Sequence, residues 1–227
     1  MVLLKQRKIS AIGTQKREAI LHAAEKEFER RGFGGARMQS IADLAGVPKA
    51  NVHYYFSGKQ GLYNAVLERI IGLWDQTFPP ISADDNPKIV LSAFVKKKVE
   101  FTRLHPQATR IFTSEILYGG PNLSDYLKNR MTQWTHDRAE VINQWIKSGK
   151  IRPVDSFHLI FLIWASTQHY AQSEIQIRSV YQKSQLTRED YRRQAESLTM
   201  MVLRICGLDN SESNSGNNVK STLANNE

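Results

Sequence analysis

The amino-acid sequence predicts an all-α fold in two parts, a small N-terminal three-helix domain and a larger C-terminal helical domain. Nearly every segment repeats its apolar residues at the spacing of a helix, and no segment alternates apolar and polar residues as a strand would. Glycine and proline stand at the expected helix ends. The 227 residues suffice for one small domain and one of ordinary size.

The first helix is expected to begin after Thr14, which would serve as its N-cap, and to end at Gly32. Ile20, Ala24 and Phe28 lie four residues apart and predict one buried stripe.

A second, short helix is expected over about residues 38–45, with Ile41 and Leu44 buried. Gly46 would end it, because glycine adopts the positive φ of a tight turn at little cost.

A third helix is expected over about residues 49–55, where Pro48 in the first turn loses no hydrogen bond. Val52 and Phe56 would turn inward against the first helix. Two short helices joined by a tight turn are the elements of a helix-turn-helix.

Ser57 and Gln60 have the spacing of a capping box and predict the start of a longer helix, with the buried stripe Leu62, Val66, Ile70 and Leu73. A proline-containing loop follows over residues 79–87. Asp155 and Thr187 are expected to cap the last two of five further helices, at about 87–104, 107–117, 122–148, 155–171 and 187–206.

The charge balance favours a polyanionic partner such as double-stranded DNA. Lys and Arg number 31 against 22 Asp and Glu, a net charge of +9. Residues 1–56 hold 10 basic and 5 acidic side chains, so a quarter of the chain carries over half of the excess.

Several classes of protein are excluded by the remaining composition. The longest apolar run, residues 159–165, is too short for a membrane helix and predicts a helix buried on all sides. No stretch resembles a signal peptide, so we expect a cytoplasmic protein without a membrane partner. Cys206 is the single cysteine and is expected to be a buried thiol. No metal site, cofactor or catalytic residue is predicted.

The third helix carries the candidate DNA-binding residues. Lys49, Asn51, His53 and Tyr54 would face away from the core, where they can enter a major groove. Lys59, beside a helix N-terminus, is placed to hold a phosphate.

The string from Phe33 to Leu62, FGGARMQSIADLAGVPKANVHYYFSGKQGL, resembles the DNA-binding signature of the TetR family. The resemblance implies a DNA-binding transcription regulator and adds Arg37 and Gln39, at the start of the second helix, to the candidate DNA contacts. One departure is Arg37, because the family usually has Ser or Thr there as a cap and phosphate contact.

Three strings, HPQATR (105–110), WIKSGK (145–150) and HLIFLIWASTQHY (158–170), resemble a pyrimidine-sensing branch of the same family. This resemblance extends over most of residues 14–180. That resemblance implies a free pyrimidine base, uracil or thymine, as the effector. A flat base needs an aromatic or apolar slot and a few placed polar partners. The candidate ligand-binding residues are Trp74, Lys98, Trp164 and Gln168.

Each of these four side chains also has a simpler interpretation. A tryptophan on an apolar face is usually part of the core, and Gln168 can instead bond across a dimer interface. Lys98 shares a helical face with Phe94 and Phe101 and can reach solvent on its long stem.

A homodimer is expected, because the last two helices present more apolar surface than one small domain covers. The side chains concerned are Phe157, Phe161, Leu198, Met201, Val202 and Ile205. A two-fold dimer would read an imperfect palindrome.

The sequence therefore predicts a flexible basic arm (1–13), a helix-turn-helix domain (14–58), a helical effector-binding and dimerisation domain (59–207) and a disordered tail (208–227). The arm is either a solvated tail or a DNA contact. The predicted function is a repressor released from its operator by the effector. The alternatives are the same fold responding to an unrelated small molecule, an activator, a helical enzyme, or an adaptor that no longer binds DNA.

Overall fold

The computed structural model describes residues 11–209, and that part of the chain is built of helices without a strand, as predicted. Most of the predicted basic arm and nearly all of the predicted tail lie outside the described residues. Within residues 11–209, no helix combines the length and apolarity needed to cross a bilayer. The N-terminal helices are α1 (Ala11–Gly35), α2 (Met38–Ala45), α3 (Lys49–Phe56) and α4 (Lys59–Thr77).

Helix α1 begins at Ala11, so Thr14 lies inside the helix and the prediction that it caps α1 is wrong. Residues 11–13 already have a helical backbone. At Gly32 the backbone leaves the helical region, with φ 64° and ψ 176°, which is the break that the sequence predicts.

The ends of α2 are as predicted, with Gly46 in the left-handed region at φ 64°. Ile41 is fully buried, but Leu44 is 58% exposed, so its predicted burial is wrong. Helix α2 has only two turns and buries Ile41 and Ala42. The side chain of Leu44 at its last turn therefore lies outside the core.

The predicted capping box at Ser57 is also wrong. Ser57 itself adopts the left-handed conformation, φ 53°, and ends α3. Gly58, with φ 106°, precedes the first residue of α4, and no side chain caps that helix. A turn this short uses both residues for the change of direction, so the Ser57 hydroxyl is not directed at the α4 amides.

The C-terminal part differs from the prediction in two places. The single helix expected over 122–148 is divided, with a turn of π-helix before its long portion, and a helix over Glu174–Tyr181 was not predicted. That helix has only two turns and no buried residue, although Ile175, Ile177 and Val180 are apolar. The elements are α5 (Pro87–Leu104), α6 (Pro106–Leu117), α7 (Ser124–Tyr126), the π-turn η1 (Leu127–Met131), α8 (Thr132–Lys147), α9 (Ser156–Gln172), α10 (Glu174–Tyr181) and α11 (Arg188–Ile205).

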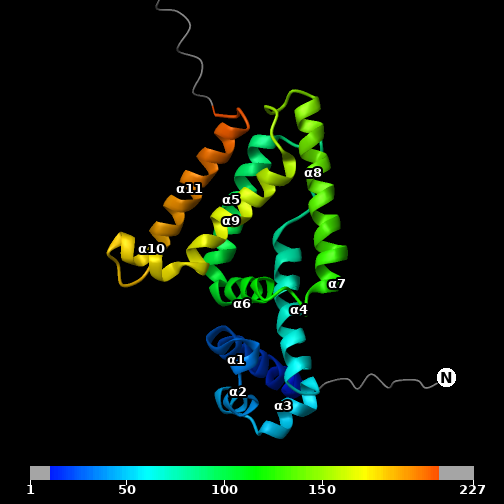
Figure 1. Ribbon diagram of the computed structural model, residues 1–227, viewed down its shortest axis with the longest axis vertical. Helices are drawn as coiled ribbons and strands as arrows, with labels where there is room; N and C mark the ends of the chain where they lie inside the picture. Colours follow the sequence, from blue (N-terminus) through cyan, green and yellow to red (C-terminus); the bar gives the residue numbers. More distant parts are fainter. Residues whose placement is uncertain (1–10, 210–227) are drawn as a thin grey trace, which may run out of the picture.

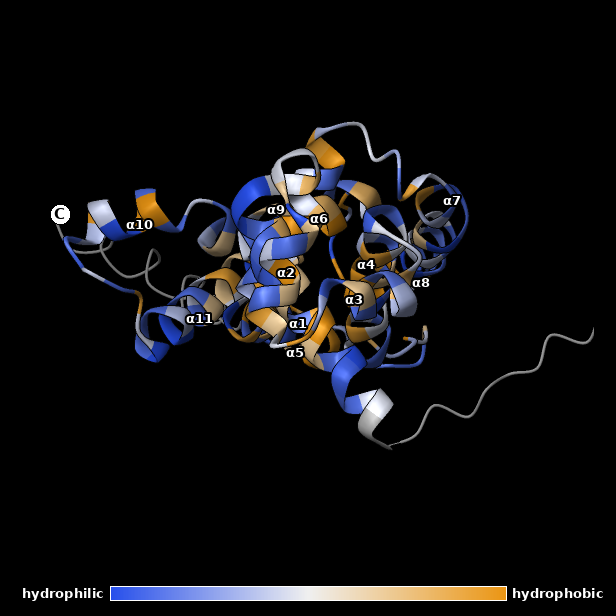
Figure 2. Cartoon of the chain, turned by 90° about the horizontal axis from the view of Figure 1, so that it is seen from below, coloured by the Kyte–Doolittle hydropathy of each residue, from blue (hydrophilic) through white to orange (hydrophobic). Residues whose placement is uncertain are grey.

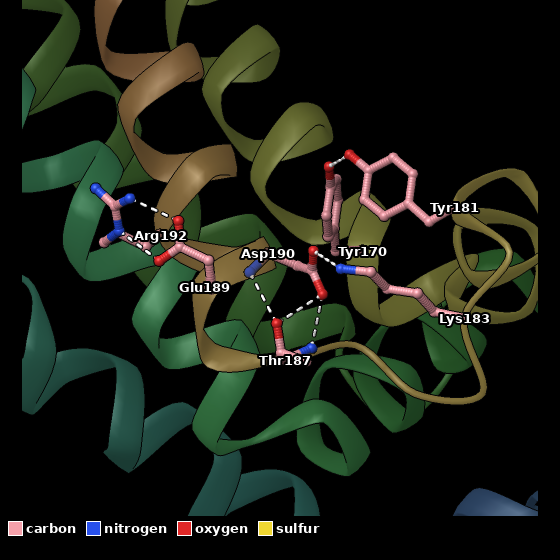
Figure 3. Close-up of polar contacts among 7 residues, drawn as sticks. All are labelled: Tyr170, Tyr181, Lys183, Thr187, Glu189, Asp190 and Arg192. Carbon is pink, nitrogen blue, oxygen red and sulfur yellow. Dashed lines mark hydrogen bonds and ion pairs between the residues drawn. The ribbon is translucent and has the colours of Figure 1, made fainter.

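The predicted caps of the last two long helices are confirmed. Asp155 accepts a hydrogen bond from the His158 amide at 2.8 Å. Thr187 and Asp190 form a capping box at the start of α11 (Figure 3). The Lys183 ammonium lies 2.5 Å from Asp190 Oδ1. Together with the Thr187 contacts it lowers the pKa of Asp190 to about 2.

The helices form two lobes that α4 joins (Figure 1). Helices α1, α2 and α3 make the lower lobe, and α5, α8, α9 and α11 run along the long axis of the upper one. Helix α6 crosses between the lobes, and α10 projects to one side. Viewed from the lower end, α2 and α3 lie in front of the other helices (Figure 2).

Two apolar cores correspond to these lobes. The first contains buried residues of α1 to α4 and also Ala108, Ile111 and Phe112 of α6. The second is built from α5, α8, α9 and α11 and includes Cys206, whose thiol pKa burial raises to about 11, in agreement with the predicted buried thiol. Helix α6 therefore belongs to the core of the lower lobe as well as to the cavity-bearing part of the chain.

Candidate DNA-binding face and ligand cavity

Helix α3 presents a polar face away from the lower core. Val52 is fully buried and Phe56 is 5% exposed, and these two side chains fix the rotation of the helix. Lys49, His53 and Tyr54 are exposed and Asn51 is half-buried. Helix α3 itself lies at the lower end of the molecule (Figure 1). The arrangement is that of a recognition helix held by its apolar side.

At the start of α2, Arg37 and Gln39 are both exposed, and Gln39 donates to Asp43 Oδ1 at 2.8 Å. Arg37 makes no side-chain cap. Instead, its backbone amide donates to Glu27 Oε1 of α1 at 3.3 Å. Glu27 is 1% exposed and also pairs with Arg31 at 3.2 Å. A buried carboxylate from another helix thus binds the N-cap amide and places negative charge at the start of α2, but it does not bond the first-turn amides that a Ser or Thr would cap.

Lys59 is half-buried and connects the start of α4 to the end of α1. Its Nζ donates to the Gly34 carbonyl at 3.0 Å and lies 5.0 Å from the centre of the Phe33 ring. An ammonium has three N–H donors, so this bond leaves donors for a phosphate. The phosphate contact remains a prediction.

Sequence reasoning missed one residue that sets the angle between α3 and α4. A Cβ added at Gly61 would lie 2.0 Å from the Phe56 carbonyl oxygen. Only glycine allows the first turn of α4 to pass this close to the end of α3.

The upper lobe contains a cavity of about 410 Å³, here called the ligand cavity. All four predicted ligand-binding side chains, from three different helices, lie on its wall: Trp74, Lys98, Trp164 and Gln168. Its volume is within the usual range for small-molecule sites. The remaining lining residues are Asp75, Phe78, Phe94, Phe112, Thr113, Ile116, Tyr126, Met131, Trp134, Phe161, Ala165 and Gln172.

Lys98 is buried, at 6% exposure, so it does not reach solvent on its stem. Its Nζ lies 5.5 Å from the centre of the Trp74 ring and 5.6 Å from that of Phe78. Burial lowers the pKa of the Lys98 ammonium to about 8. Among residues 11–209, no hydrogen bond or ion pair to this nitrogen is found, so the cavity holds an amine without a protein acceptor.

Trp74 contributes a second donor without a partner. Its ring packs edge-on against Phe112, with 4.3 Å between the ring centres. The indole Nε1 is buried and lacks a hydrogen-bond partner in the described part of the chain. The cavity wall thus presents two N–H donors, on Trp74 and Lys98, that have no acceptor within residues 11–209.

Helix α9 lines the opposite wall with an amide pair and a tryptophan. Gln172 Nε2 donates to Gln168 Oε1 at 3.2 Å and to Thr113 Oγ1 at 2.8 Å. Trp164 lies 5.9 Å, centre to centre, from Trp134 of α8. Gln172 lies four residues after Gln168 on α9, and this spacing was the only sequence feature that pointed to it. No sequence feature pointed to Trp134 or Tyr126.

Helix α6 lines the cavity through Phe112, Thr113 and Ile116 and also makes polar contacts with α1, α4 and α9. Arg110 Nε lies 2.7 Å from Glu29 of α1, and its Nη1 donates to the Ala171 carbonyl at the end of α9 at 3.2 Å. Tyr63 of α4 donates to the buried carboxylate of Glu115 at 3.0 Å. Helix α6 therefore contacts both the cavity and the helices that position α3.

Several large apolar side chains of α9 and α11 are exposed to solvent. Phe161 is 47% exposed, Met201 52% and Ile205 43%, so α9 is not buried on all sides within one chain. Val202 is 3% exposed and belongs to the core, so its predicted place on this surface is wrong. Helix α11 packs closely against α5, and this packing buries Val202, which the helical spacing had predicted to lie on the outer surface.

The family models agree with this architecture and define the class of protein. The model for bacterial regulatory proteins of the tetR family matches residues 20–66, and the model for the C-terminal region of YcdC-like proteins matches residues 67–209. The chain belongs to the TetR family and is a DNA-binding transcription regulator, not an enzyme.

Among curated proteins, the chain is 42% identical over 165 residues to the HTH-type transcriptional regulator RutR of Escherichia coli (strain K12). That match covers 73% of this chain and 78% of RutR. The HTH-type transcriptional repressor NicS of Pseudomonas putida is 32% identical over 105 residues, which cover 46% of this chain and 50% of NicS.

Solved structures share the fold at low identity. The ketosteroid transcriptional regulator KstR2 of Mycobacterium tuberculosis matches with a TM-score of 0.64 and 20% identity, over 83% of this chain and 93% of that one. AibR in complex with isovaleryl coenzyme A and operator DNA matches with a TM-score of 0.63 and 20% identity, over 82% of this chain and 97% of that one.

Proposed function

We propose that this regulator is a homodimeric repressor that a pyrimidine base, uracil or thymine, releases from a palindromic operator. The observation that carries the proposal is the convergence of Trp74, Lys98, Trp164 and Gln168 on one cavity. An unrelated small molecule remains the alternative effector.

The cavity chemistry suits a pyrimidine base. The carbonyl oxygens of the base would accept from the Lys98 ammonium and from the Trp74 indole, whose Nε1 lacks a partner in the described part of the chain. Its ring N–H groups need an acceptor, which a carboxamide such as that of Gln168 provides. The rings of Trp164 and Trp134 form an aromatic wall for the flat face.

The polar face of α3 supports DNA reading by Lys49, Asn51, His53 and Tyr54, with Arg37, Gln39 and Lys59 beside it on phosphates. Replacing Lys59 by Ala should weaken binding to specific and non-specific DNA alike. It should also reduce the slope of log affinity against log salt by about one phosphate contact. An unchanged slope would exclude Lys59 as a phosphate contact.

The apolar surface of α9 and α11 supports dimerisation by a four-helix contact. A two-fold axis through this surface would relate the α3 helices of the two subunits. These helices must lie about 34 Å apart to enter successive major grooves. Sedimentation of the purified chain tests this step, and a monomer at micromolar concentration would contradict it.

Helix α6 is the proposed connection between effector and operator. Arg110 joins α1 to the α9 end of the cavity, so a ligand that moves α9 changes the position of α1. Replacing Arg110 by Ala should leave uracil binding within about threefold but reduce the effect of uracil on operator affinity. Unchanged coupling in the variant would show that Arg110 does not carry the signal.

The decisive experiment is operator binding with and without uracil at fixed salt. Genomic fragments that the purified protein retains supply the operator. Uracil should raise the dissociation constant, and cytosine, with its different hydrogen-bonding edge, serves as the matched control. Equal operator affinities with and without uracil or thymine would remove the pyrimidine proposal and leave the DNA-binding regulator in place.

A further inference from the structure

The ligand cavity contains a primary amine in an environment that increases its reactivity. Lys98 is 6% exposed and its nitrogen lies among the rings of Trp74 and Phe78, at 5.5 and 5.6 Å from their centres. No carboxylate pairs with it within residues 11–209. Its neighbours Lys96 and Lys97 on α5 are exposed, as lysines normally are.

We propose that Lys98 is a covalent site for small aldehydes, which form a reversible imine with its side-chain amine inside the ligand cavity. Lysines that are desolvated in an apolar pocket are the usual Schiff-base residues in proteins. The inference does not depend on a pyrimidine effector, because it rests only on the amine and the cavity around it.

The reaction balances without an oxidant or reductant. The neutral amine donates its lone pair to the aldehyde carbon, and the carbonyl oxygen takes up a proton to give a carbinolamine. The carbinolamine then loses its hydroxyl together with the second amine proton as water, and a C=N bond replaces the C=O bond. Water reverses the reaction when the aldehyde is removed.

The cavity favours this product in two ways. Burial lowers the pKa of Lys98 to about 8, so that roughly half of it is neutral at pH 8, against less than about 1% of an ordinary lysine. A protonated imine keeps the positive charge at the same place, where the faces of Trp74 and Phe78 attract a cation. The aromatic lining selects flat, unsaturated aldehydes.

Two other titratable groups line the cavity. Asp75 of α4 forms an ion pair with Arg130. Tyr126 of α7 has a pKa that burial raises to about 12, so it remains neutral. The pKa of Lys98 is shifted by burial alone. The fraction of Lys98 present as neutral amine should therefore rise with pH in one step, with its midpoint near pH 8.

The test is reductive trapping on the full-length protein. Benzaldehyde at limiting concentration and sodium cyanoborohydride are added at pH 8. Hydride transfer to the imine carbon fixes a benzyl group on the lysine, and peptide mapping by mass spectrometry locates it. Lys98 should be labelled at least about tenfold faster than Lys97, because its larger neutral fraction outweighs the lower nucleophilicity of a weaker base.

Two variants complete the experiment. Lys98→Arg keeps a cation but has no primary amine, and should lose the fast-labelled site, whereas Lys97→Arg should retain it. If Lys98→Arg does not fold, the ratio of Lys98 to Lys97 labelling in the unchanged protein decides the question alone. Equal labelling of the two lysines, or a Lys98 rate that still rises beyond pH 10, would overturn the proposal. Uracil binding is measured in parallel without aldehyde, so that failure of the imine proposal can be told apart from failure of the pyrimidine proposal.

Discussion

The buried lysine of the ligand cavity should destabilise the free protein, and its replacement by methionine should reverse this. Lys98→Met keeps a long, flexible side chain that fills the same space but carries no charge. The pKa of Lys98 falls from 10.5 to about 8 on folding. A shift of this size corresponds to roughly 3 kcal/mol of destabilisation when the amine is protonated.

The sign follows from the protons bound in each state. The folded protein holds the Lys98 proton less tightly than the unfolded chain does. The penalty is therefore complete below about pH 8 and disappears as the pH rises toward 10.5. Loss of the contacts between the ammonium and the aromatic rings offsets part of the gain. We expect Lys98→Met to be more stable than the unchanged protein by about 2–3 kcal/mol at pH 7, with a midpoint of unfolding roughly 5–10 °C higher.

The assay is thermal and urea unfolding at pH 7 and pH 10, at one protein concentration because a dimer's stability depends on concentration. The advantage of Lys98→Met should shrink at pH 10. Lys97→Met, on the exposed side of α5, is the matched control and should change stability by less than about 0.5 kcal/mol at either pH. A Lys98→Met protein that is less stable at pH 7 would refute the reasoning, because the ammonium would then have an acceptor.

The other predictions concern the lower lobe and the start of α11. Gly61→Ala should destabilise the protein by about 1–3 kcal/mol and abolish operator binding, because its Cβ would lie 2.0 Å from a carbonyl oxygen. Gly72→Ala, in open space on the same helix, should be neutral or stabilising in the same urea melts. Glu27→Gln should reduce stability by about 1–2 kcal/mol and weaken operator binding in a shift assay, and wild-type affinity would contradict its capping role. Asp190 has a pKa lowered from 3.8 to about 2, so the stability it adds is complete above pH 4 and is lost as the pH falls through 2. Asp190→Asn should flatten that part of the acid unfolding curve. An unchanged curve would show that the Asp190 carboxylate does not contribute to stability in this pH range.

The sequence alone determined the features that depend on neighbouring residues. Gly46 ended α2, Asp155 capped α9, and Thr187 with Asp190 formed a capping box, because each device is completed within a few residues of the chain. The inward side chains of α3 also followed from spacing. Resemblance to a family indicated a pyrimidine effector, and helical spacing then selected Trp164, Gln168 and Lys98 as candidates.

Only the tertiary structure decided the features made by residues far apart in the chain. Glu27 reaches the amide of Arg37, Lys59 reaches the carbonyl of Gly34, and α11 buries Val202, and none of these follows from local spacing. Periodicity reports which side of a helix is apolar, but it does not report which neighbour covers that side or which donor is left without an acceptor. The unpartnered amine of Lys98, on which the candidate site depends, is a property of packing between helices.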